Sequence, residues 1–161
     1  MTDGPKPDET FTGDLQPYYA ALGEFIAKFA MTEQLMQLLL REVANVEDSV
    51  AKSIFSGTRV EAATQYIRRI TEAQNVSEEK TKGLFRAFDQ LSIIRIVRND
   101  LIHIGAGDFD ENWNSVVSNA LVAHAERTVR ETAISPKIIA SLIRDLELIS
   151  NHLLIYGRRE D

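Results

Sequence analysis

Residues 84–107, LFRAFDQLSIIRIVRNDLIHIGAG, carry the clearest structural signal in the chain. Their apolar side chains point to nearly every side of a helix, so the second half of this helix should be enclosed by other helices or by a partner chain. Gly105 and Gly107 follow, and glycines at this position typically end a helix, with Gly105 expected in a left-handed cap. The stretch therefore predicts a central helix within a bundle.

Apolar residues at three- and four-residue steps predict a long amphipathic helix before it, from Leu15 to about Asn45. Val46, Val50 and Ile54 indicate a short second helix, which ends near Gly57.

Two capping signals follow. Thr58 and Glu61 have the spacing of a capping box, which predicts the start of a third helix that continues through Ile70. Ser77, followed by two glutamates and a lysine, is expected to begin the helix that contains residues 84–103.

The C-terminal third is expected to contain a small β insert and a last helix. Residues 114–134 are rich in Val and Thr around a polar tip near His124, which favours a β-hairpin, although the spacing of Val116, Ala120 and Ala123 also tolerates a helix. Ser135 and Pro136 are typical of a helix start, and the apolar pattern continues to Gly157. The predicted fold class is mainly α, a helical bundle with a hairpin near 114–134.

Composition limits both domain organisation and function. The 161 residues contain 18 Lys and Arg against 24 Asp and Glu, a net charge of -6, so any contact with a nucleic acid must be local. Residues 1–14 are expected to form a flexible acidic tail and residues 15–161 a single domain. With no cysteine, the chain has no disulfide, zinc ribbon or thiol nucleophile, and this composition suits a reducing compartment.

The sequence indicates neither a membrane segment nor a metal site. No apolar run approaches the roughly 18 residues that span a bilayer, and residues 1–14 lack the apolar core of a signal peptide, so a cytoplasmic location is expected. The three histidines are too far apart to form a helical metal pair, and we expect no metal and no cofactor. His124 and His152 are interpreted as surface or packing residues.

Four polar residues cluster on one side of the central helix. With Leu84 at 0° on an ideal helix, Arg98 lies at about 320°, Arg95 at about 20°, Asn99 at about 60° and His103 at about 100°. Asp100 is expected to face solvent. Phe109 and Trp113, just beyond the cluster, are able to stack on a base, but packing against the core is the favoured role for Trp113.

Glu33 is a polar residue on the apolar stripe of the first helix, about 20° from Leu22. The structural interpretation is an ion pair between Glu33 and Arg95 or Arg98, which need a partner on an otherwise buried helix. The functional interpretation combines a fixed cation with His103, an imidazole able to exchange a proton near neutral pH. Phosphodiester cleavage without a metal requires these two groups.

The string VRNDLIHIG, residues 97–105, resembles the HEPN superfamily of all-helical domains. The signature is an arginine, often followed by asparagine, and then a histidine near the end of a core helix. Here four residues separate Arg98 from His103. The order of elements is also similar, from a first helix with a polar glutamate to a final helix after a glycine-rich turn. The resemblance thus extends over most of residues 15–157, and residues 98–103 carry its specific part.

This resemblance implies a metal-independent endoribonuclease whose two motif copies meet in a homodimer and form one composite site. His103 would act as general acid or base, Arg98 would hold the scissile phosphate, and Asn99 would orient the phosphate or the histidine. Arg95 and Glu33 are supporting residues that we add from helical geometry. The ideal-helix divergence of about 140° between Arg98 and His103 is a further argument for a site shared by two chains.

Many members of such families are toxins controlled by an antitoxin protein or parts of anti-phage defence systems, so these roles and partners are expected beside the RNA substrate. The alternative is a non-catalytic HEPN-like module that binds RNA, a nucleotide or a protein through the same face. A third hypothesis is a structural protein in which the arginines and Glu33 form a buried network.

Overall fold

The computed structural model describes residues 14–120, 123 and 128–157. It contains five helices and one two-stranded antiparallel sheet in these residues. The elements in chain order are α1 (Gln16–Ala44), α2 (Asp48–Phe55), α3 (Val60–Ala73), α4 (Glu78–His103), β1 (Ser115–Ser118), β2 (Glu131–Ile134) and α5 (Pro136–Gly157). The predicted fold class, mainly α with a small hairpin, is therefore confirmed.

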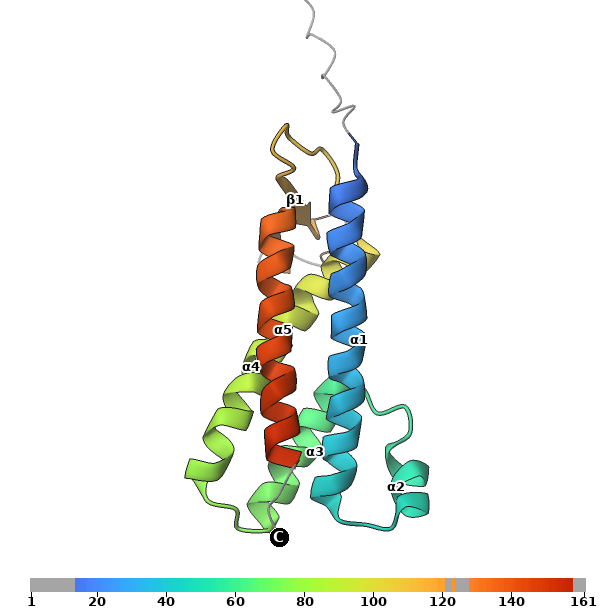
Figure 1. Ribbon diagram of the computed structural model, residues 1–161, viewed down its shortest axis with the longest axis vertical. Coiled ribbons are helices and arrows are strands. Elements are labelled where there is room, and N and C mark those ends of the chain that lie inside the picture. Colours follow the sequence, from blue (N-terminus) through green and yellow to red (C-terminus); the bar gives the residue numbers. More distant parts are fainter. Residues whose placement is uncertain (1–13, 121–122, 124–127, 158–161) are drawn as a thin grey trace, which may run out of the picture.

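The two helices at the front of Figure 1, α1 and α5, lie side by side and run in the same direction. Lys28 Nζ contacts Glu147 Oε1 at 2.6 Å, and the hydroxyls of Thr32 and Ser150 are 3.0 Å apart one turn further along. In Figure 1, α4 crosses behind this pair, the hairpin lies at the end where α1 and α5 begin, and α2 and α3 lie toward the other end. The bundle thus gives α4 a position against both α3 and α5.

One apolar cluster draws on all five helices and both strands. Most of its largest fully buried side chains come from α1, α4 and α5, as the periodicity predicts, while α3 contributes Ile67 and β2 contributes Ile134. Those side chains include Phe25, Phe29, Met36 and Leu40 of α1, Leu91 and Ile94 of α4, and Leu146 and Leu153 of α5. Of the expected tail at 1–14, residues 1–13 lie outside the described residues, as do residues 158–161 of the expected domain.

The predicted helix boundaries at α4 and α5 are confirmed. α4 follows Ser77 and ends in front of Gly105, which has φ +81° and donates its N–H to the carbonyl of Asp100 at 3.2 Å. α5 begins at Pro136, and Ser135 Oγ accepts the N–H of Ile138 at 3.3 Å. A left-handed glycine and a serine N-cap therefore fix the two ends that border the hairpin.

The predicted capping box of α3 is wrong. α3 begins at Val60, one residue too late for Thr58 to be the N-cap, and the N–H of Thr58 donates to the carbonyl of Phe55 at 3.1 Å. The Thr58 carbonyl accepts the side-chain amide of Gln37. A local hydrogen bond and a contact with α1 therefore hold Thr58, and Glu61 does not act as a capping residue.

The hairpin is confirmed where it is described. β1 pairs with β2 from Ser115 opposite Ile134 to Ser118 opposite Glu131, so the helical alternative for 114–134 does not hold at the strands. Asn119 closes the ladder, since its Oδ1 accepts the N–H of Arg130 at 2.5 Å. His124, at the expected tip, lies outside the described residues.

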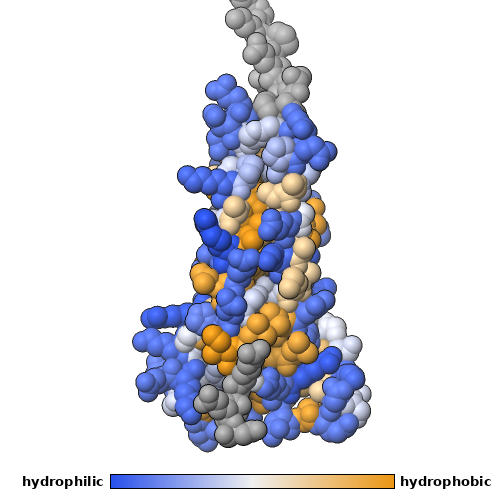
Figure 2. All heavy atoms as spheres, viewed as in Figure 1, coloured by the Kyte–Doolittle hydropathy of each residue, from blue (hydrophilic) through white to orange (hydrophobic). Residues whose placement is uncertain are grey.

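Apolar side chains also reach the surface. Figure 2 shows them gathered in the lower half of the view, where α1 and α5 end, and Leu38 and Ile155 are 58% and 72% exposed. Within the described part of the chain, none of the helices has the length and apolar character that crossing a bilayer requires.

Candidate functional site

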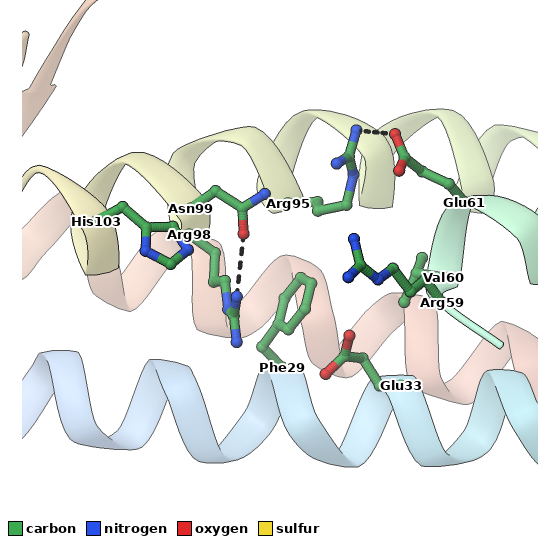
Figure 3. A pocket seen from close by; sticks show the side chains of 9 residues that line it. All are labelled: Phe29, Glu33, Arg59, Val60, Glu61, Arg95, Arg98, Asn99 and His103. Atoms are coloured by element: carbon green, nitrogen blue, oxygen red, sulfur yellow. Dashed lines mark hydrogen bonds and ion pairs between the residues drawn. The ribbon is translucent and has the colours of Figure 1, made fainter. Parts of the chain in front are cut away.

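A cleft of about 330 Å³ lies among α1, α3 and α4 (Figure 3). It is lined by Phe29, Glu33, Arg59, Val60, Glu61, Arg95, Arg98, Asn99 and His103. The structure therefore brings all five residues singled out in the sequence, Glu33, Arg95, Arg98, Asn99 and His103, to one cleft.

α4 supplies the polar wall of this cleft, and apolar residues next to that wall on the same helix hold α4 in the core. Leu91, Ile94 and Leu101 are buried, which fixes the rotation of the helix about its axis. Arg95, Arg98 and Asn99 are half-buried, and His103 is exposed at the last residue of the helix. The wall thus runs from a shielded arginine to an imidazole that solvent and a ligand can reach.

Arg98 is fixed by two neighbours. Its Nη1 donates to Asn99 Oδ1 at 3.0 Å, and its Cζ lies 5.4 Å from the ring centroid of the buried Phe29, a cation–π distance. Among the described residues, Arg98 Nε is buried and has no acceptor. A buried N–H without a partner costs about 1–3 kcal/mol, so the site gains when an acceptor enters.

The expected ion pair between Glu33 and the arginines of α4 is not formed. Arg95 instead pairs with Glu61 of α3 through Nη2 and Oε1, and none of the described residues lies within ion-pair distance of Glu33. The reason is that α3 approaches α4 at this level, which brings the misread capping residue Glu61 to Arg95 (Figure 3). The structural hypothesis predicts a buried network between Glu33 and the arginines of α4, and this network is not formed among the described residues.

Four lining residues were missed in the sequence: Phe29, Arg59, Val60 and Glu61. Phe29 precedes Glu33 by four residues on the same helix, so helical periodicity was able to place them together. Arg59, Val60 and Glu61 reach the cleft through the packing of α3 on α4, a long-range contact that carries no local sequence signal.

The charge of the cleft differs in sign from that of the whole chain. Three guanidiniums and two carboxylates line it, whereas the chain carries a net charge of -6. Because the whole chain is acidic, an anionic ligand would bind only where the local charge is positive, as it is in this cleft.

Asp100 does not face solvent as expected. It is buried, with its side chain 11% exposed, and Arg130 Nη2 lies 3.0 Å and 3.3 Å from its two carboxylate oxygens. The hairpin, which begins after the glycine turn, folds back over the end of α4 and covers this carboxylate. Asp100 therefore ties the helix to the hairpin and does not belong to the cleft.

The aromatic residues after the motif pack against the core. Phe109 contacts Tyr18 with ring centroids 4.7 Å apart, and both Phe109 and Trp113 are partly buried against the apolar cluster. Neither lines the cleft. The favoured packing role of Trp113 is thus confirmed, and base stacking by these residues has no support from their placement.

The divergence of Arg98 and His103 on an ideal helix does not separate them in the folded chain. Both line the same cleft of one chain, because a long arginine side chain sweeps around the helix surface. This divergence alone therefore does not require a second copy.

The enclosure expected for α4 is incomplete within one chain. Ile93, Ile96 and Ile102 are 58%, 38% and 43% exposed. Ile96 lies about 20° from His103 around the helix, so an uncovered apolar strip borders the cleft.

In the described ranges, histidines and carboxylates do not gather into a group of three or more suited to a metal ion. Comparisons of the chain with protein-family models, with curated proteins and with solved structures gave no match, so the resemblance to HEPN domains rests on the residues quoted above.

Proposed function

We propose that the chain is a metal-independent endoribonuclease of the HEPN type, with Arg98, Asn99 and His103 at its centre. The observation that carries the proposal is the cleft itself. It combines an arginine whose buried Nε lacks an acceptor with an exposed imidazole on the same wall.

Arg98 binds the scissile phosphate. Its guanidinium is oriented by Asn99 and Phe29 before a ligand arrives, so little reorganisation is needed when charge builds on the phosphate oxygens. Charge-assisted hydrogen bonds from arginine to phosphate are stronger than neutral ones, which favours the transition state over the ground state as charge accumulates.

His103 transfers the proton. As a base it takes the proton of the ribose 2'-hydroxyl, and the 2'-oxygen then forms a bond to phosphorus while the bond to the 5'-oxygen breaks. A second acid gives its proton to the leaving 5'-oxygen. The products are a 2',3'-cyclic phosphate and a 5'-hydroxyl end.

A homodimer supplies the second acid in this proposal. The exposed Ile93 and Ile96 lie one turn apart on α4, with Ile96 about 20° from His103 around the helix and about 10 Å from it along the axis. Burying these two isoleucines against a second copy would bring the partner's α4, and with it the partner's His103, toward the first cleft. Apolar side chains at a surface favour such association because their burial releases about 25 cal/mol per Å².

Arg95 and Glu33 support the site. Arg95 lies one turn from Arg98 and is held in place by its ion pair with Glu61, while Glu33 lies across the cleft (Figure 3). Control by an antitoxin protein, or a role in anti-phage defence, would follow if a partner covered the cleft in the resting state.

The test is RNA cleavage by purified Arg98→Ala and His103→Ala variants beside matched controls on α5, Arg144→Ala and His152→Ala. Arg144 and His152 are exposed and do not line the cleft. We expect the two cleft variants to lose cleavage by at least about 100-fold, the usual contribution of one proton-transfer or charge-stabilising group. The controls should match wild type.

Equal activity in all four variants would contradict the proposal. RNA binding without cleavage by folded wild-type protein would instead favour the non-catalytic binding module. Circular dichroism of each variant separates loss of activity from loss of fold.

A further inference from the structure

Arg59, the residue before α3, is the third guanidinium of the cleft, and the RN…H motif does not include it. Figure 3 shows its side chain extending between Arg95 and Glu33 into the open space of the cleft. Among the described residues, no carboxylate lies within ion-pair distance of it. Arg59 is thus a cation that faces the cleft without a charge partner.

The backbone at Arg59 is fixed although its side chain is exposed. The next residue, Val60, is buried at 6% exposure, and the Arg59 carbonyl accepts the N–H of Ala63 at 2.9 Å. The preceding residue, Thr58, is bound to Gln37 of α1. The Arg59 side chain therefore extends into the cleft from a backbone position that hydrogen bonds and a buried neighbour hold in place.

Neighbouring carboxylates do not neutralise Arg59. Glu61, two residues further on, is engaged by Arg95, and Glu33 forms no ion pair with any described residue. The start of α3 thus adds two charged side chains to the cleft. Glu61 is already paired with Arg95, whereas Arg59 has no ion-pair partner among the described residues.

The cations are spread along the cleft. Arg95 lies about 4.5 Å from Arg98 along the axis of α4, and about 12 Å from His103. The ion pair between Glu61 and Arg95 places the start of α3 next to Arg95. Arg59 and His103 therefore lie on opposite sides of Arg98 along the cleft (Figure 3). One phosphate at Arg98 leaves Arg59 available for another.

Resting on the proposed function, we infer that Arg59 binds the phosphate adjacent to the scissile one, so that the substrate is a single strand with at least two consecutive phosphates. A cleft of about 330 Å³ is at the small end of ligand sites, roughly 300–1,000 Å³, and suits a short length of one strand. Arg59 then acts in binding and contributes little to the chemical step.

Binding is measured first, with a fluorescein-labelled single-stranded RNA of mixed sequence over a series of salt concentrations. The proteins are His103→Ala, which should not cleave the probe, and His103→Ala carrying Arg59→Gln or Arg144→Gln. Each phosphate contact on a single strand contributes about 0.7 to the slope of log affinity against log salt. Arg59→Gln should lower that slope by about 0.7 and weaken binding about ten-fold, the size of one charge-assisted contact. Arg144→Gln should change neither quantity.

Cleavage is measured second, with a dinucleoside monophosphate and a trinucleoside diphosphate. Wild type should prefer the trinucleotide through a lower KM, and Arg59→Gln should remove this preference with kcat unchanged. Arg59→Lys should restore the salt slope, because lysine keeps the charge.

The outcomes separate the two proposals. If wild type cleaves RNA but Arg59→Gln changes neither the salt slope of binding nor the preference for the trinucleotide, the Arg59 subsite is wrong and the nuclease proposal stands. Binding that depends on Arg59 without any cleavage by wild type would keep the phosphate subsite and overturn the nuclease. RNA that binds to none of the proteins would overturn both.

Discussion

Arg130 of the hairpin holds the carboxylate of Asp100 with one nitrogen, Nη2, at 3.0 Å and 3.3 Å from the two oxygens. Asp100 follows Asn99, which lines the cleft on another side of α4. Two successive residues of the motif thus have different tasks, since Asn99 orients Arg98 and Asp100 attaches the helix end to the hairpin. The hairpin therefore helps to set the position of the last turn of α4, where His103 lies.

Arg130→Gln should lower the free energy of unfolding by about 1–2 kcal/mol, because it leaves the carboxylate of Asp100 buried without its cation. The half-exposed side chain of Arg130 keeps the effect below that of a fully buried pair. Denaturant unfolding measures it. In a double-mutant cycle, Asp100→Asn should remove most of the cost of Arg130→Gln, and full additivity would show that the two side chains do not interact.

Asp110 should stabilise the turn before β1 in a pH-dependent way. Asn114 donates its side-chain amide to this carboxylate at 2.9 Å, and this bond, followed by the backbone N–H bonds of Asn114 and Asn112, holds the pKa of Asp110 below its ordinary value of 3.8. The folded state thus binds the proton less readily than the unfolded state, so the contribution is complete above the unfolded pKa and is lost as the pH falls through the folded one.

Asp110→Asn removes this titration. The stability difference between wild type and Asp110→Asn, from denaturant unfolding at several pH values, should be constant near neutral pH and shrink as the solution becomes more acidic than pH 3.8. A difference that does not change with pH would show that the ionised form of Asp110 has no special role.

Glu61→Gln should strengthen RNA binding. It removes the carboxylate that neutralises Arg95, and one surface charge is worth up to about 1 kcal/mol, or roughly five-fold in affinity. The free energy of unfolding should change by less than about 1 kcal/mol because the Glu61 side chain is 60% exposed. Glu72→Gln, an exposed change on α3 outside the cleft, is the control, and equal affinities of the two variants would argue against an anion site at Arg95.

Ile96→Asp should convert the proposed homodimer into monomers, because a carboxylate would be buried in its interface. Sedimentation over a range of protein concentrations measures the change. Ile54→Asp on α2, where the isoleucine is 62% exposed, is the matched control and should leave the dimer intact. Unchanged association of Ile96→Asp would place any dimer contact elsewhere, the apolar ends of α1 and α5 in Figure 2 being the next surface to test.

The sequence predicted elements whose signals are local. The ends of α4 and α5 follow from Gly105, Ser135 and Pro136, whose backbone preferences act within a few residues. The cluster of Arg95, Arg98, Asn99 and His103 follows from the period of one helix.

The errors concern contacts between distant elements. The spacing of Glu61 from Thr58 predicts a helix cap, but Glu61 is engaged by Arg95 of α4. The sequence predicts Asp100 in solvent, but Arg130 covers it. Which helix approaches a given turn is set by packing over the whole bundle, and no local pattern encodes it.

The most direct test of the central claim is incubation of wild type and His103→Ala with a mixed RNA in EDTA, followed by analysis of the new ends. The variant also controls for a contaminating nuclease. Wild type alone should cleave the RNA and leave 2',3'-cyclic phosphate and 5'-hydroxyl ends. Intact RNA with folded, dimeric wild type, or equal cleavage by both proteins, would contradict a metal-independent nuclease centred on His103.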